Sequence, residues 1–425
     1  MLTPARQLSE PSAVQPRVDY WLLGAALALL LVGVVMIASA SMDYAGQRYG
    51  EPLFFLHRHL VYIVLALALS LIAFRFPMAL WQRLSPLLLL SSIAVLLLIL
   101  VPGVGHTANN ATRWLALGPF TLQGSELAKL AVVAYLGSYL VRQQELVKSR
   151  WMGIISPMIV MVALVVLLLL QPDFGAVVVL FGTALGMLFL GGARLWQFSL
   201  VLLASLLAAV AMVASSPYRM DRWLAFLNPW ADQFGEGYQL TQSLIAFGRG
   251  EWFGLGLGNS IQKLFYLPEA HTDFIFAILA EELGLLGCFL TLALYAVVVV
   301  RILLAARRAE SGGNAYSAYV AYGIALIFSA QLFINVGVNI GLLPTKGLTL
   351  PFLSYGGSSL LVSCIAIALV SRVVYECNLQ YGDLHARRSG AIARAAIDSS
   401  LRRKRSVSAT PLSRCRAEPV EVVNG

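Results

Sequence analysis

The sequence alternates long apolar runs with short polar connectors, and this pattern restricts its fold more than any other feature. Charged residues make up only 12% of the 425 positions, whereas a soluble domain of this size carries roughly 25%. A run of about 20 apolar residues is long enough to cross about 30 Å of hydrocarbon as a helix. The sequence therefore predicts an all-α integral membrane protein.

The apolar runs predict about ten transmembrane helices. They lie at residues 20–41, 54–74, 80–101, 126–141, 152–170, 174–191, 195–214, 273–303, 316–341 and 350–375. The eighth run holds 31 residues, which would extend about 46 Å at 1.5 Å per residue. We expect this helix to tilt or to protrude from the membrane.

The basic residues predict the orientation. Of the 30 Lys and Arg residues, 21 lie on the side of the N-terminus, 8 lie on the opposite side, and Lys129 lies within a span. Lys and Arg concentrate on the cytoplasmic side of membrane proteins. Both termini are therefore expected in the cytoplasm, with the large loop at about 215–272, between helices seven and eight, in the periplasm.

The same pattern divides the chain into a cytoplasmic segment at 1–19, a polytopic membrane domain at 20–375 and a basic tail at 376–425. The tail is rich in Ser and Arg and has few large apolar residues, so we expect it to be disordered. Anchoring against anionic lipid explains the net charge of +9. Docking of a cytoplasmic partner is the alternative, and no nucleic-acid partner is needed.

The long connector is rich in aromatic residues, which indicates that it lies on the outer membrane interface. Within it, the segment Tyr238–Phe247 has apolar residues at helical spacing and predicts a short interfacial helix. The glycines of Gly254–Gly258 then interrupt helical structure.

An acidic residue stands at the head of the eighth span, in His271-Thr272-Asp273. If the hydrocarbon begins near Leu283, Asp273 lies at or just above the outer leaflet, where acids usually face a protein-lined aqueous cavity. The sequence alone leaves two roles open for it, a helix cap and a catalytic acid. Glu281 and Glu282 follow inside the same apolar run.

Further polar residues lie at membrane depth. Glu126 and Lys129 share one helix face and can pair. Arg113-Trp114, in the loop before them, could bind a lipid phosphate or anchor the loop at the interface. Asn335 and Asn339 line one face of the ninth span, where interhelical hydrogen bonding is the favoured interpretation.

Three segments together resemble the SEDS family (shape, elongation, division and sporulation): Pro268–Phe274, Gly341–Gly347 and Pro351–Ser359. The similarity extends over roughly 20–375, and Gln171–Gly175 and Arg113-Trp114 also fit. The segment from Phe226 to Ser243 resembles the division type more than the elongation type. One departure is Gly124, where the family usually has Pro.

The resemblance implies a peptidoglycan glycosyltransferase that polymerises lipid II at the outer face of the bacterial inner membrane during septal cell-wall synthesis. It also implies a class B penicillin-binding protein as partner, beside other membrane proteins of the division machinery. Asp273 matches the family's catalytic Asp, and a positioned carboxylate can accept the proton of a sugar hydroxyl.

The leaving group would be a lipid pyrophosphate, whose charge calls for cations. The candidate substrate-binding residues are Lys129, Glu126, Arg113, Trp114, Lys346 and Lys263. A divalent ion could assist them. Because the sequence has no His/Cys cluster for zinc, oxygen ligands would favour Mg²⁺ or Mn²⁺.

Two other functions fit the pattern less well. A lipid II flippase would also have about ten spans and polar residues at membrane depth, but its sites must be reachable from both sides. Here the main acid and the large loop gather on one side. A non-catalytic division scaffold would explain the tail but not the charges inside the membrane.

Overall fold

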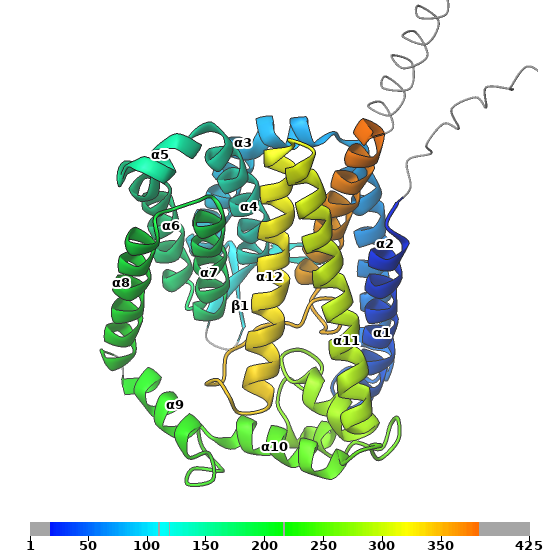
Figure 1. Cartoon of the computed structure of the whole chain (residues 1–425). Helices are drawn as coiled ribbons and strands as arrows, with labels where there is room; N and C mark the ends of the chain where they lie inside the picture. Colours follow the sequence, from blue (N-terminus) through cyan, green and yellow to red (C-terminus); the bar gives the residue numbers. More distant parts are fainter. Residues whose placement is uncertain (1–17, 109–110, 119, 216, 382–425) are drawn as a thin grey trace, which may run out of the picture. The chain divides into compact units, whose positions relative to one another are not determined.

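The structure, a computed structural model, describes residues 18–108, 111–118, 120–215 and 217–381 (Figure 1). In this part of the chain, eight helices are long and apolar enough to cross a membrane. They are α1 (Tyr20–Tyr49), α2 (Phe54–Arg75), α3 (Met78–Leu100), α6 (Met152–Leu170), α8 (Leu195–Ala214), α11 (Ile275–Ser311), α12 (Ala315–Asn339) and the last helix, Gly357–Tyr381.

Two further helices, α4 (Gly124–Arg142) and α7 (Phe174–Leu190), occupy the remaining predicted spans. Every predicted span therefore overlaps one observed helix, and the helical membrane class is confirmed. A short helix, α5 (Gln144–Ser149), lies between α4 and α6. The predicted segment 1–19 is described only from residue 18, and nearly all of the predicted tail lies outside the described residues.

Local chemistry explains where α1 begins and ends. Asp19 caps its first turn by accepting a hydrogen bond from the N–H of Leu22 at 3.1 Å. The helix then runs past the predicted end to Tyr49, and it ends at Gly50, which adopts the left-handed conformation (φ 73°) that favours glycine.

Two predicted spans need correction near the site. The eighth was expected at 273–303, but α11 begins at Ile275 and runs to Ser311, with a non-helical residue at Gly284. The tenth was expected from residue 350, but the last helix begins at Gly357. Leu350–Ser354 instead form turns, in which Oγ of Ser354 accepts from the N–H of Leu350 at 2.8 Å. Apolar composition alone did not distinguish these buried turns from helix.

The predicted loop before the fourth span contains a small antiparallel sheet that the sequence analysis missed. Its strands β1 (Gly105–Ala108), β2 (Ala111–Leu117) and β3 (Phe120–Gln123) pair in that order. The strands are too short to show a clear period-2 pattern. The sheet matters because β2 carries Arg113 and β3 leads directly into α4.

The long connector contains α9 (Pro217–Leu227), α10 (Tyr238–Gly250) and a short π-helical turn, η1 (Gln262–Tyr266). The predicted interfacial helix is α10, which is confirmed as a helix, whereas α9 was not predicted. In Figure 1, α9 and α10 run along the end of the bundle opposite α5. The hydroxyl of Ser243 in α10 donates to the carbonyl of Asn339 at 2.7 Å, which ties α10 to the end of α12.

Residues 18–377 form one compact unit, and connectors predicted to share a side meet within it. At one end, Arg301 pairs with Asp19 at 2.6 Å, and Arg372 donates to the carbonyl of Phe74 at 3.3 Å. At the other end, the N–H of Tyr355 donates to the carbonyl of His271 at 2.9 Å. The grouping agrees with the predicted alternation, and which end faces the cytoplasm stays a prediction.

Candidate functional site

Asp273 lies in a tight turn immediately before α11, and its side chain is half-buried. The turn is closed by the N–H groups of Thr272 and Phe274, which both donate to the carbonyl of Glu269, at 3.1 and 3.3 Å. The residue at the N-cap position of α11 is Phe274, and no hydrogen bond to the carboxylate of Asp273 occurs within the described residues. The helix-cap role that the sequence left open is therefore not supported.

The surroundings of Asp273 favour its neutral form. The pKa of Asp273 is raised to about 7, with burial as the largest cause and the carboxylates of Glu269 and Asp173 contributing in the same direction. The guanidinium of Arg113 opposes them and lowers it. A carboxylate with a pKa near the working pH is well suited to accept a proton in catalysis.

Arg113 reaches this cluster from β2. Its guanidinium donates to the carbonyl oxygens of Gln171 and Pro172, with a distance of 3.3 Å for the first bond. These two bonds hold the cation against the turn before α7. Trp114 is the next residue in β2, so its side chain points to the other face of the sheet. It pairs in register with Gln123 and is half-buried.

Asp173 is a charged member of this cluster that the sequence analysis did not propose as a site residue. It is 2% exposed. One carboxylate oxygen caps α7 by accepting from the N–H of Ala176 at 3.3 Å. The other accepts from the hydroxyl of Ser125 at 2.9 Å and from the amide of Gln123 at 3.2 Å. Its place in the matching segment Gln171–Gly175 was the signal that could have identified it.

Lys346 and Gly347 reach the cluster from the segment that follows α12. The ammonium of Lys346 lies 4.6 Å from the ring centroid of Phe174, the first residue of α7. A Cβ atom built on Gly347 would lie 2.8 Å from Oδ2 of Asp273. Arg113 and Lys346, from two distant segments, therefore both contact residues 171–174. Asp273, in the turn before α11, lies close to this cluster through Gly347 and through the charges of Arg113 and Asp173.

Glu126 and Lys129 form a separate site inside the bundle. The Nζ atom of Lys129 lies 2.7 Å from Oε1 of Glu126, and the two side chains are 1% and 6% exposed, respectively. The pair lines a cavity with the side chains of Gln331 and Ser363. In the described part of the chain, the amide nitrogen of Gln331 has no hydrogen-bond partner. Pairing is confirmed, but no described hydrogen bond or ion pair joins these two residues to Asp273.

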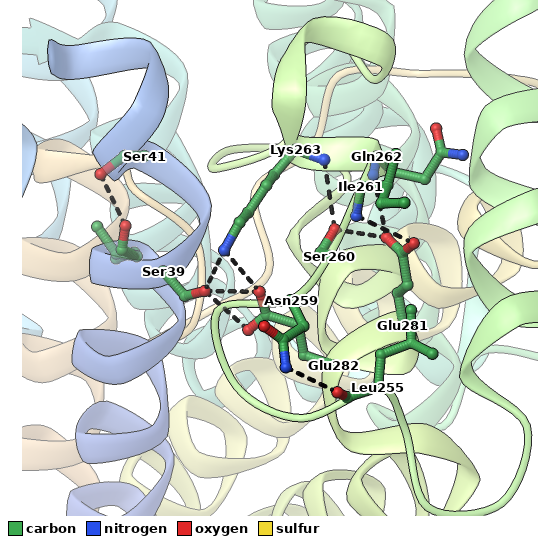
Figure 2. A network of polar contacts seen from close by, with 11 residues as sticks. Ser39, Ser41, Leu255, Asn259, Ser260, Ile261, Gln262, Lys263, Glu281 and Glu282 are labelled. Atoms are coloured by element: carbon green, nitrogen blue, oxygen red, sulfur yellow. Dashed lines mark hydrogen bonds and ion pairs between the residues drawn. The ribbon is translucent and has the colours of Figure 1, made fainter.

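Lys263 belongs to a third group, which Figure 2 shows. Its Nζ atom donates to Oε1 of Glu282 and to the hydroxyl of Ser39 in α1, both at 3.0 Å. Its side chain is 5% exposed and that of Glu282 is fully buried. The structure thus places this predicted substrate-binding cation in a buried ion pair between η1, α11 and α1.

Glu281 completes the same network. Its carboxylate accepts from the hydroxyl of Ser260 and from the N–H groups of Ile261 and Gln262, both at 3.2 Å (Figure 2). Arg249 also lies 3.3 Å away. Both acids that follow Asp273 along the chain are therefore fully engaged in holding the connector onto α11.

The described residues contain no group of three or more His, Cys, Asp or Glu side chains placed to hold a metal ion. Near Asp273, both carboxylate oxygens of Asp173 already accept hydrogen bonds from the protein. The side chains of the site therefore do not by themselves fit a protein-held Mg²⁺ or Mn²⁺ centre.

Comparison with known proteins identifies the family of this chain. Residues 20–379 match the family described as cell cycle protein, FtsW/RodA/SpoVE. The chain is 54% identical over 361 residues to the probable peptidoglycan glycosyltransferase FtsW of Nitrosococcus halophilus, covering 85% of this chain and 93% of that protein. It is 50% identical over 364 residues to the protein of the same name from Pseudomonas fluorescens, covering 86% and 89%.

A solved structure is also similar. It belongs to a peptidoglycan synthase complex that coordinates polymerisation and crosslinking, and it superimposes with a TM-score of 0.71 at 28% identity. The similarity covers 85% of this chain and 98% of that chain. With the family match over nearly all of the helical domain, the chain belongs to the SEDS family, the cell cycle proteins that include FtsW, RodA and SpoVE.

Proposed function

We propose that this protein is a peptidoglycan glycosyltransferase of the FtsW type, which polymerises lipid II into glycan strands at the outer face of the inner membrane during septal synthesis. The observation that carries the proposal is the carboxylate of Asp273, which has a pKa of about 7, feels the charge of Arg113 and lies close to Gly347, the residue after Lys346. The names of the relatives at 50% identity or more support the same activity.

In the proposed reaction, a hydroxyl oxygen of the acceptor sugar attacks the anomeric carbon of the donor. Asp273 accepts the hydroxyl proton as the new carbon–oxygen bond forms. The bond between the anomeric carbon and the pyrophosphate oxygen breaks, and the lipid pyrophosphate leaves with the electron pair. Arg113 and Lys346 are the cations proposed to stabilise its charge, because both contact residues 171–174, in the cluster that includes Asp273.

We propose different roles for the remaining predicted substrate contacts. Trp114 points to the face of the sheet opposite Arg113, so its proposed contact with the lipid-linked substrate lies outside the Asp273 cluster. Glu126 and Lys129 lie in their own cavity, so they are proposed to affect substrate binding from the bundle interior. Lys263 is already paired with Glu282, which favours a role in holding the connector.

The proposal includes a divalent cation only as an ion that arrives with the substrate. Mg²⁺ commonly binds phosphate oxygens together with one or two carboxylates and water. Asp273 is the carboxylate of the site whose oxygens accept no hydrogen bond within the described residues. No step of the reaction above depends on such an ion.

A class B penicillin-binding protein is the proposed partner. The support is the similarity in fold to a chain of a complex that coordinates polymerisation with crosslinking. A transpeptidase beside this protein would crosslink the strand as it emerges. Location at the division septum is proposed on the same basis as the FtsW-type activity.

The test is polymerisation of purified lipid II by the wild-type protein and by Asp273→Asn, each alone and with the partner. Loss of general-base help typically costs about 10²–10⁴ in rate, so the variant should make almost no glycan while it stays folded and partner-bound. Near wild-type polymerisation by the folded variant would contradict the base assignment. Lipid II flipping without polymerisation by the wild type would favour the transporter.

A further inference from the structure

Two buried amides at the end of α12 hold the backbone of Asp273. The Nδ2 atoms of Asn335 and Asn339 donate to its carbonyl oxygen, at 2.9 and 3.1 Å. The side-chain oxygen of Asn339 accepts from the N–H of Ala277 in the first turn of α11, at 3.2 Å. Both asparagine side chains are buried. The turn that carries Asp273 is therefore fixed to α12 through its main chain.

Asn335 makes a second hydrogen bond, to the segment that lies beside the Asp273 carboxylate. Its Nδ2 atom also donates to the carbonyl of Leu348 at 2.6 Å. The neighbouring residue, Gly347, lies against Oδ2 of Asp273. An asparagine amide has two N–H groups, and both are used here. One side chain thus joins the backbone of Asp273 to the segment that packs against the Asp273 carboxylate.

We propose that Asn335 is a positioning residue for Asp273, whose amide fixes the Asp273 carboxylate against Gly347 in the orientation needed to deprotonate the sugar hydroxyl. This inference rests on the proposed function. General attachment of one helix to another does not account for the pattern, because both acceptors of Asn335 lie outside helices, in the two segments that meet at the carboxylate.

The variant Asn335→Leu tests the proposal, because leucine has the same number of side-chain heavy atoms, also branched at Cγ, and no donor. Displacement of a catalytic group by about 1 Å can cost 10²-fold in rate. We expect kcat for lipid II polymerisation to fall about 10- to 100-fold, with KM within about twofold of the wild-type value. The matched control is Asn259→Leu, which removes an exposed amide-to-carbonyl bond of 2.9 Å to Leu255 that involves neither Asp273 nor the segment beside its carboxylate. The control should leave kcat unchanged.

The pH profile separates positioning from a structural role. Without the two hydrogen bonds of the Asn335 amide, the turn relaxes and the carboxylate gains water, so the pKa of Asp273 falls towards its ordinary value. The charges of Glu269, Asp173 and Arg113 act on Asp273 in both proteins. The acidic limb of kcat should shift to lower pH in Asn335→Leu. If the amide only holds the bundle together, the amount of folded protein falls and the limb does not move.

The proposal is overturned if kcat of Asn335→Leu stays within about twofold of wild type, or if kcat falls with an unshifted acidic limb. If Asn335→Leu does not fold, Asn335→Ser gives the same test, since its hydroxyl is too short to bond both carbonyls. Absence of glycan from the wild-type protein would instead overturn the proposed function, which separates the two failures.

Discussion

The carboxylate of Asp273 occupies the space beside Gly347, since a Cβ atom added at residue 347 would lie 2.8 Å from Oδ2. A side chain at this position must displace the carboxylate, which can rotate because it is the end of a flexible side chain. The fold therefore tolerates a methyl group here, while the proposed base moves. A substitution at Gly347 therefore tests the orientation of the Asp273 carboxylate without disrupting the fold.

We accordingly expect Gly347→Ala to insert and fold normally but to polymerise lipid II at least about tenfold more slowly, in line with the sensitivity of catalysis to misplacement. The measurement is the glycan yield of the purified variant at equal protein concentration. Gly182→Ala in α7 is the matched control, because nothing lies within 4 Å of its added Cβ atom. Equal activity of Gly347→Ala and wild type would show that the orientation of the carboxylate does not limit the reaction.

The pH dependence of the rate should report the ionisation of Asp273. Its pKa of about 7 means that the base form is lost as the pH falls, so kcat should rise with pH through about 7 and then level off. Because Arg113 lowers this pKa, Arg113→Gln should move the limb to higher pH. Glu269 raises the pKa, so Glu269→Gln should move the limb to lower pH. Shifts in the same direction for both variants would contradict this account.

The same ionisation predicts a stability effect. The pKa of Asp273 is higher in the folded than in the unfolded state, so its contribution is most favourable at low pH and is lost as the pH rises towards and through about 7. Asp273→Asn removes the ionisable group. Its melting temperature relative to wild type should therefore rise between pH 5 and pH 8. A difference that is constant over this range would show that burial does not perturb the carboxyl.

Local patterns in the sequence predicted the helices and the pairing of Glu126 with Lys129, because both follow from spacing along one helix. They also placed Asp273 at the head of α11. They could not predict that Arg113 lies beside it, since the two residues meet only through a sheet too short to be recognised.

The same limit applies to Lys263. Its partners Ser39 and Glu282 come from α1 and α11, and no local pattern indicates a pairing across 224 residues. The sequence alone therefore predicts a substrate contact for Lys263, as a cation of the outer connector that could bind the lipid pyrophosphate. Sequence reasoning proposed Asp273, Arg113 and Lys346, missed Asp173, and failed where the role of a residue depends on its tertiary neighbours.

The Glu126–Lys129 pair can be tested by a double-mutant cycle. Removing one partner leaves an uncompensated charge among buried side chains, whereas removing both leaves none. If the two residues only neutralise each other's charge, the double variant Glu126→Gln/Lys129→Met should be more active than either single variant. If Lys129 binds substrate phosphate, the double variant should be as inactive as Lys129→Met. Polymerisation rates of the three variants decide between the two roles.

The orientation can be tested with introduced cysteines in a variant without its native cysteines. Gly235 and Ser311 are both exposed, one in the connector after α9 and the other at the end of α11. The split of basic residues predicts that Gly235→Cys reacts with an impermeant thiol reagent on intact spheroplasts and that Ser311→Cys does not. Lysed cells, in which both should react, serve as the control. The reverse pattern would place the proposed site on the cytoplasmic side.

Variants of the Lys263–Glu282 ion pair can distinguish a structural role of Lys263 from a role in substrate binding. Lys263→Met leaves Glu282 buried without its cation, which typically costs about 3–5 kcal/mol, so the melting temperature should fall. Glu282→Gln should have a similar effect, because it leaves Lys263 without its carboxylate. The double variant should recover most of the stability, and KM for lipid II should stay near the wild-type value. If instead Lys263 binds the lipid pyrophosphate, KM should rise in Lys263→Met and stay raised in the stabilised double variant. If the double variant recovers stability but its KM stays raised, Lys263 binds substrate. If the double variant recovers stability and its KM is near the wild-type value, Lys263 holds the connector onto α1 and α11.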